Sequence, residues 1–295
     1  MLSSDQQRLC VFSLVLTVST TALAQTSLCP NPVPVGTFCV PANTTFNVPK
    51  GWIGASKMIF EDGSHVRFDP SVQPDWSLQI DTIVAGTGVV FDLSGADSQA
   101  PKPPQPPQAA AGNQMDNGHA GDSGRQGGRG QDSAKLELDV QTLIVGGLVL
   151  LRHGGRGGPG GDGGIGGNGG GGNCGHGGGD GGVGGRGGMG GVGGDAKRVK
   201  ISYRSLSQPP NPPIFAGVLS LAPGITDDVE VGHGGVPGNS EHGGPGGNGV
   251  WCWTPSWPPA QYHTSNGHWH DRDVPPNMGP GPDGNDEGAV LANHQ

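Results

Sequence analysis

The sequence is short of the residues that build an ordinary globular core. Aromatic residues make up only 5% of its 295 positions, with 7 Phe and 2 Tyr, and charged residues make up only 14%. A conventional enzyme of this length buries one large core of Leu, Ile, Val and Phe beneath charged faces. The composition therefore excludes one conventional core across the whole length of the chain.

The chain also lacks long runs of one charge. It carries 25 acidic and 16 basic residues, for a net charge of −9, with no basic stripe that could displace counterions from phosphates. We therefore expect no nucleic-acid partner and no polybasic contact with a membrane. Beyond the first 24 residues no apolar run approaches the length of a membrane span, so we expect no transmembrane segment in the mature chain.

The first 24 residues resemble a targeting segment. Arg8 precedes the apolar stretch Cys10 to Ala24, which ends in Ala22-Leu23-Ala24. A short apolar region closed by an A-x-A sequence is typical of a secretory signal peptide. We expect residues 1–24 to be removed and the protein to be extracellular, periplasmic or associated with the cell surface. A membrane anchor is the alternative.

Four cysteines remain after the signal peptide: Cys29, Cys39, Cys174 and Cys252. An even number in an exported chain predicts two disulfides, for which three pairings are possible. The pairing of Cys29 with Cys39 closes a short loop and is favoured, which leaves Cys174 with Cys252. The sequence contains no CxxC motif and no cysteine–histidine spacing of the kind that binds structural zinc.

Glycine is the most abundant residue, with 60 copies, and it is strictly periodic. The run from Gly154 to Asp195 divides into 14 triplets, each of which begins with Gly. The second position is also Gly except at Asn173 and His176. Shorter runs with nearly the same period cover residues 112–132 and 232–249.

A three-residue period is that of the extended left-handed helix, which makes no internal hydrogen bonds. Collagen fits poorly, because Pro159 is the only proline in the run and two positions of each triplet are Gly. Two edges without side chains allow neighbouring helices to exchange backbone hydrogen bonds, as in a bundle of polyglycine-II helices. Gly169 to Gly178 predicts a reversal between two arms of about 17 residues, roughly 50 Å long. A disordered flexible linker is the alternative.

Between the glycine runs lie segments rich in β-branched residues and bounded by turn residues, which is typical of strands. They cover residues 57–68, where Asp62-Gly63 marks a hairpin or a corner, and residues 78–95, 136–155, 199–206 and 218–235. The segments 78–95 and 136–155 share the pattern L-x-(I/L)-D, an apolar pair, a Gly corner and a second apolar strand. We predict an all-β, solenoid-like stack of strands with glycine-rich excursions. An antiparallel sandwich is the alternative.

The predicted organisation follows these composition shifts. After the signal peptide we expect an N-terminal Cys loop with β rungs (25–95), a Pro/Gly-rich excursion (96–135), a rung (136–153), the glycine bundle (154–195), further rungs (196–231), a Gly-rich excursion (232–249) and a Trp/His-rich tail (250–295).

The tail carries the most unusual chemistry. Its aromatic residues could form a platform for stacking sugars; this candidate ligand set is Trp251, Trp253, Trp257, Tyr262 and Trp269. A candidate metal set of imidazole and carboxylate ligands is His268, His270 and Asp271. The interpretation that we favour for the tail is structural: the tryptophans cover the open end of the strand stack, which would otherwise expose backbone edges.

Two short motifs point weakly to other chemistry. Gly157 to Ile165 approaches a calcium-binding nonapeptide repeat, with Asp162 in place, but Gly164 occupies the required apolar position. Gly121-Asp122-Ser123-Gly124 is similar to a serine-protease motif, but it lies inside a glycine run and no triad partners are evident. We assign no catalytic residue and no cofactor.

The run from Gly154 to Asp195 resembles the glycine-rich bundles of snow-flea antifreeze proteins and of some phage tail-fibre tip adhesins. Glycine-rich, collagen-like exported bacterial proteins are also similar, with a strand such as Phe91 to Gly95 leading into Gly repeats. The resemblance implies a bundle fold and no particular function.

We therefore expect a secreted structural or adhesive protein that is not an enzyme, with an extracellular polysaccharide or the cell envelope as its partner. The first alternative is a polysaccharide-binding module that uses the Trp-rich tail. The second is an ice-binding protein, suggested by the resemblance; Arg156, Arg186 and Met189 interrupt the flat face of small residues that such a protein uses.

Overall fold

The computed structural model describes residues 28–207, 219–222, 224–253, 260–268 and 275–293. Within these ranges the chain is all-β, with 14 strands and no helix. It follows that no described helix is long and apolar enough to cross a membrane. The predicted signal peptide lies outside the described residues.

Most strands belong to two six-stranded sheets. The first sheet has the order β1 (Thr37–Val40), β3 (Lys57–Phe60), β5 (Asp75–Ala85), β7 (Lys135–Val145), β9 (Val199–Ser207) and β14 (Ala289–Asn293). The second has the order β10 (Leu219–Ala222), β11 (Ile225–Glu230), β8 (Leu148–His153), β6 (Val89–Asp92), β4 (His65–Arg67) and β2 (Thr45–Asn47). Neighbours pair in parallel throughout, except that β10 and β11 are antiparallel.

The chain alternates between the two sheets. β3 lies in the first and β4 in the second, so Asp62-Gly63 forms a corner between sheets and not a hairpin. Gly63 has a φ of 66°, a conformation that glycine adopts without strain. The parallel pairing of β5 with β7 shows that the antiparallel-sandwich interpretation is wrong for these strands.

The apolar core lies between the two sheets and is built by alternation along each strand. In β5 the inward residues Trp76, Leu78 and Ile80 are buried, while the residues between them are exposed. Aromatic rings join the sheets at the centre: Phe91 of β6 lies with ring centroids 5.2 Å from Phe60 and 5.6 Å from Phe68. These ring contacts link the two sheets through the apolar core.

The register of β5 and β7 differs from the one that their shared sequence pattern suggests. The pattern aligns Leu78 with Leu136, whereas the structure pairs Leu78 with Leu138. A shift of two residues leaves every inward side chain inward, so alternation alone does not distinguish the two registers. Asp139 consequently lies beside Gln79 and not beside Asp81.

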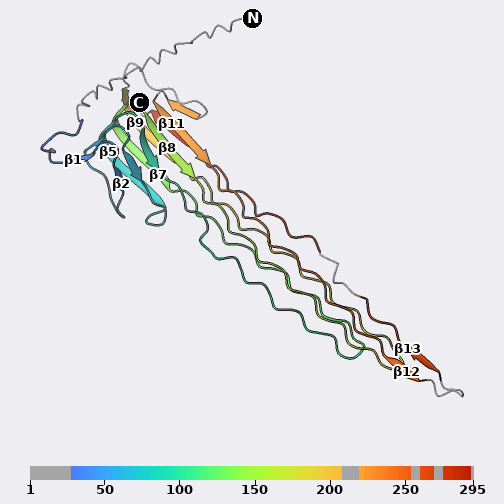
Figure 1. The fold of residues 1–295 in the computed structure, drawn as a ribbon. Helices are drawn as coiled ribbons and strands as arrows, with labels where there is room; N and C mark the ends of the chain where they lie inside the picture. The colour runs from blue at the N-terminus through green and yellow to red at the C-terminus, as the bar shows by residue number, and fades with distance from the viewer. Residues whose placement is uncertain (1–27, 208–218, 223, 254–259, 269–274, 294–295) are drawn as a thin grey trace, which may run out of the picture.

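A long glycine-rich bundle extends away from the sheets (Figure 1). The chain leaves the sheets and returns three times, which gives six extended segments: 96–112, 116–133, 154–172, 177–195, 231–249 and 264–286, the last with a gap at 269–274. At about 3.1 Å per residue, segment 154–172 is about 60 Å long. We call the end with the two sheets the head and the far end the tip.

Segment 154–172 runs through the centre of the bundle and exchanges backbone hydrogen bonds with its neighbours. Gly157, Gly160 and Gly163 donate to carbonyls of segment 231–249, each at 2.9 Å. The next glycine of each triplet donates to segment 116–133 at 2.7 to 2.8 Å, and its carbonyl accepts from segment 177–195. The glycine runs are therefore laterally paired, which contradicts the linker alternative.

These hydrogen bonds continue the ladders of the head. The amides of Leu93 and Gly95 donate to Leu151 and His153, and the amide of Ser98 then donates to Arg156 with the same offset. Backbone donors that face the segment containing Leu151 to Arg156 lie two residues apart in the head and three residues apart in the bundle. The strands of the head thus set the register of the bundle at its base.

Glycine is required in the bundle for close approach. A Cβ atom added at Gly182 would lie within 3.0 Å of the carbonyl oxygens of His119 and Gly118, and most other bundle glycines face a backbone atom in the same way. Atoms at that separation must shift, and here the neighbours are backbone. The third position of each triplet points outward and carries the side chains, as Val183 does.

A charged network joins the head to the bundle. Arg152 of β8 and Asp227 of β11 form a buried pair, with Nε–Oδ1 and Nη2–Oδ2 distances of 2.8 and 2.6 Å. Burial alone would lower the pKa of Arg152, but its hydrogen bonds with Asp227 hold it above the usual value. Nearby, the hydrogen bond from Lys197 to Glu287 holds the pKa of the lysine well above its usual range. Both positive charges therefore stay paired at the base of the bundle.

The close approach predicts how the bundle responds to a single methyl group. Gly182→Ala should lower the free energy of unfolding by about 1–3 kcal/mol or more, because the methyl group overpacks against backbone. Val183→Ala, one residue along and 47% exposed, should change it by less than about 0.5 kcal/mol. Urea denaturation of both variants measures the difference, and equal stabilities would contradict the assigned packing.

Candidate functional site

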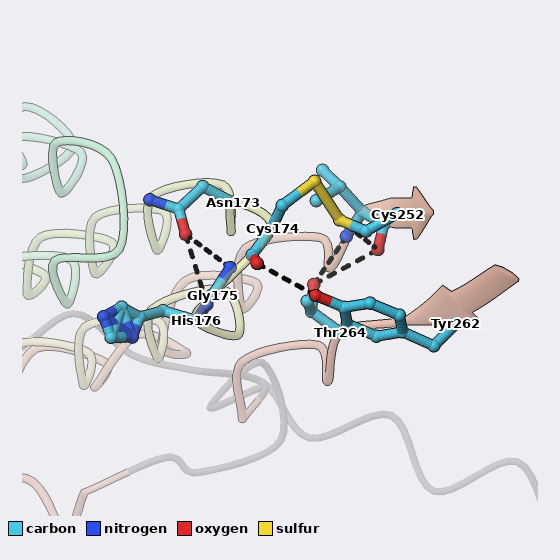
Figure 2. Close-up of a disulfide and its surroundings, with 8 residues drawn as sticks. Asn173, Cys174, Gly175, His176, Cys252, Tyr262 and Thr264 are labelled. Atoms are coloured by element: carbon cyan, nitrogen blue, oxygen red, sulfur yellow. Dashed lines mark hydrogen bonds between the residues drawn. A yellow bond between two sulfur atoms is a disulfide. The ribbon is translucent and has the colours of Figure 1, made fainter. Parts of the chain in front are cut away.

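The tip begins with the predicted reversal of the central glycine run, which the structure confirms. Asn173 and His176 form an antiparallel bridge that turns the chain back. The side-chain oxygen of Asn173 accepts hydrogen bonds from the amides of Gly175 and His176 at 3.0 and 3.1 Å (Figure 2). The non-glycine residues that interrupt the repeat thus build the turn.

Both favoured disulfides are present. Cys29 and Cys39 are joined with their Cα atoms 5.9 Å apart, and Cys174 and Cys252 with theirs 5.5 Å apart. The second disulfide ties the turn at the tip to β12 (Trp251–Trp253), and the Cys252 side chain is buried (Figure 2).

A two-stranded ribbon forms the end of the tip. β12 pairs antiparallel with β13 (Gln261–His263), so that Trp251 lies opposite His263 and Cys252 opposite Tyr262. Alternation turns Cys252 toward the bundle and the two tryptophans away from it. Trp251 and Trp253 are 67% and 66% exposed, and the Trp251 ring meets the His263 ring edge-on at 4.9 Å. We call Trp251, Trp253 and His263 the aromatic tip.

Hydrogen bonds hold the ribbon to the bundle. The Tyr262 hydroxyl donates to the carbonyl of Cys174 at 2.9 Å, beside the disulfide (Figure 2). The Thr264 hydroxyl oxygen accepts from the amide of Val250 at 2.7 Å, and the side-chain oxygen of Asn266 accepts from Gly249 at 2.8 Å. These contacts fix the orientation of the strand that carries both tryptophans.

The structure brings together only part of the predicted ligand set. Trp251, Trp253 and Tyr262 lie at the tip, whereas Trp257 and Trp269 lie outside the described residues. Tyr262 is 40% exposed and its hydroxyl is used to hold the turn. Trp251 and Trp253 lie at the end of the bundle opposite the sheets, so the interpretation that these two cover the open end of the strand stack is wrong (Figure 1).

Of the three predicted metal ligands, only His268 lies in the part of the chain that the structure describes. His268 donates its backbone amide to the Asp180 carboxylate at 2.6 Å, while His270 and Asp271 lie outside the described residues. Among the residues that the structure describes, no three His, Cys, Asp or Glu side chains are grouped so as to hold a metal ion.

The two weak motifs have structural roles in the bundle. The Asp162 carboxylate accepts from the Lys102 ammonium at 2.7 Å and from the Asn239 amide at 2.8 Å. The Lys102 hydrogen bond, aided by that of Asn239, lowers the pKa of Asp162. In the protease-like motif, Gly121 and Gly124 donate lateral hydrogen bonds to neighbouring carbonyls. Close packing therefore explains both glycine patterns.

Sequence reasoning missed two residues that position the aromatic tip, namely Thr264 and Asn266. Each is a short polar residue in a glycine-rich or loop segment, where such residues commonly cap turns. The signal that could have found them is the pairing of Cys174 with Cys252, because it places residues 173–176 beside the ends of β12 and β13.

No protein-family model and no curated protein matches the chain. One solved structure was found, that of the nine polyproline type II helical bundle springtail antifreeze protein from Granisotoma rainieri. It is 19% identical in sequence, and the match covers 66% of this chain and 95% of the antifreeze protein chain. Its TM-score of 0.09 means that the two backbones do not superpose, so this likeness carries no argument about fold or function.

The disulfide at the tip should contribute measurably to stability. The pair Cys174→Ala and Cys252→Ala should lower the free energy of unfolding by about 4 kcal/mol, because the bond closes a loop with a sequence separation of 78. The pair Cys29→Ala and Cys39→Ala, with a separation of 10, should cost about 3 kcal/mol. Urea denaturation measures both; an unchanged midpoint for the tip variant would show that the bond constrains nothing.

Proposed function

We propose that the protein is a secreted, non-catalytic adhesive protein in which the glycine bundle is a stalk that presents the aromatic tip to an extracellular polysaccharide. The observation that carries the proposal is the exposure of Trp251 and Trp253 on a strand held by the Cys174–Cys252 disulfide at the far end of the bundle.

The exposure of these rings is energetically unfavourable in the isolated protein. Burying a Trp side chain removes about 200 Å² from water at about 25 cal/mol per Å², so leaving two-thirds of it exposed forgoes about 3 kcal/mol per ring. Both rings belong to one strand and lie on one face, roughly 7 Å apart along the chain. A ligand that stacks on both rings would recover that free energy.

A polysaccharide fits this surface for two reasons. The hydrogen-bearing faces of pyranose rings are apolar and flat, and aromatic side chains provide a matching apolar face with little conformational entropy to lose. Gln261 lies opposite Trp253, and His263 lies opposite Trp251, so polar groups flank the rings. Sugar hydroxyls could hydrogen-bond to these groups while the rings stack.

We further infer that the head is a short β-solenoid and that the two central segments, 154–172 and 177–195, are polyglycine-II helices. The alternation of successive strands between two parallel sheets supports the first inference. The three-residue spacing of lateral hydrogen bonds supports the second. The disulfides are consistent with an oxidising compartment, and therefore with secretion. Ice binding is not proposed, because Arg156 and Arg186 are exposed on the bundle surface.

The experiment is binding of the chain without residues 1–24 to insoluble polysaccharides, namely cellulose, chitin, xylan and mannan. We expect saturable binding to at least one of them, and Trp251→Ala with Trp253→Ala should weaken that binding at least tenfold. Urea denaturation of this variant should be unchanged, because both rings are exposed.

The matched control is Val236→Ala, which removes another exposed apolar side chain, on the bundle and away from the tip; it should bind as the unaltered protein does. Absence of binding by the folded protein to all four polysaccharides would overturn the proposal. Binding that survives loss of both tryptophans would also overturn it.

A further inference from the structure

The head carries a second concave surface, at the opposite end of the molecule from the aromatic tip. A groove of about 670 Å³ lies on the outer face of the first sheet. Its floor is formed by residues of β5 and β7, including Gln79, Asp81 and Asp139, and Arg204 of β9 lines it as well. This volume falls in the range of small-molecule sites, about 300–1,000 Å³.

The groove exists because neighbouring strands differ in length. β3 pairs with β5 only from Thr82 to Ala85, so the first half of β5 has no strand partner on that side. Residues 53–56 cross there instead and form one wall, with Gly54 packed against Ile80. Ile53, at the edge of this wall, is 80% exposed.

The pairing among the three central strands of the first sheet, β5, β7 and β9, is interrupted at the same level in all three. The ladder between β5 and β7 passes from Ile80 to Thr82 and omits Asp81 and its neighbour Gln141. The ladder between β7 and β9 likewise omits Gln141 and Arg204. The result is a row of three exposed polar side chains across the floor, in which the Gln141 amide donates to the Asp81 carboxylate at 3.1 Å.

Several polar groups of the groove have no partner in the described part of the chain. No described residue makes a hydrogen bond or ion pair with the side chains of Gln79, Asp139 or Arg204. A carboxylate, an amide and a guanidinium together supply acceptors and donors on one concave surface.

We propose that this groove binds a short neutral oligosaccharide. Sugar hydroxyls both donate and accept, so they can donate to Asp81 and Asp139 and accept from Gln79 and Arg204. Ile53 provides an apolar contact for a ring face. Two carboxylates outnumber the single guanidinium, so an acidic sugar is repelled. The groove is independent of the aromatic tip, and the two sites would hold one polysaccharide at both ends of the stalk or two different ones.

The test is calorimetric titration of the chain without residues 1–24 with cellotriose, mannotriose, xylotriose and maltotriose, and with trigalacturonate as the acidic probe. We expect saturable binding of at least one neutral trisaccharide and at least tenfold weaker binding of trigalacturonate. Asp139→Ala and Gln79→Ala should each weaken the neutral interaction at least fivefold. Both residues are exposed on the sheet, so these variants should fold.

The matched control is Glu137→Ala, two residues along β7 on the same exposed face but outside the groove, which should bind normally. The variant with Trp251→Ala and Trp253→Ala should also retain this binding, which separates the groove from the aromatic tip. Failure of all four neutral trisaccharides to bind would overturn the proposal, and so would binding that Asp139→Ala and Gln79→Ala leave unchanged.

Discussion

Lateral hydrogen bonding between glycine backbones is the interaction on which the rest of the structure depends. An extended helix with three residues per turn leaves its amides and carbonyls without internal partners. In the bundle, neighbouring segments supply those partners at distances that leave no room for a Cβ atom, as at Gly182. In the central segments, 154–172 and 177–195, two of every three positions are therefore glycine, and the third position carries the side chains.

The head and the bundle form one hydrogen-bonded structure. The lateral bonds that begin at Leu93 and Gly95 in the sheets continue at Ser98 in the bundle with the same partner segment. The buried pair of Arg152 and Asp227 lies where β8 and β11 leave the head, and loss of one partner from such a pair commonly costs several kcal/mol. The apolar core of the head thus aligns segments that have almost no apolar surface of their own.

How much of this could be predicted depends on how far apart the interacting residues are. The three-residue period, the reversal at Asn173 and the favoured disulfide pairing follow from local sequence, and the structure agrees with them. The register of β5 against β7 does not, because pairing Leu78 with Leu136 or with Leu138 buries the same faces. The groove depends on that register and on the crossing of residues 53–56, so no sequence pattern indicated it. The exposure of Trp251 and Trp253 likewise required knowing that β12 lies at the tip.

Amide hydrogen exchange along segment 154–172, followed by NMR, tests the lateral hydrogen bonding most directly. The two glycine amides of each triplet, such as Gly160 and Gly161, donate to neighbouring carbonyls and should exchange slowly. The third-position amides of Asp162, Ile165 and Asn168 donate to no described residue and should exchange quickly. Protection that repeats every three residues is the predicted result. Uniformly fast exchange across the segment would contradict the ordered bundle and with it the stalk.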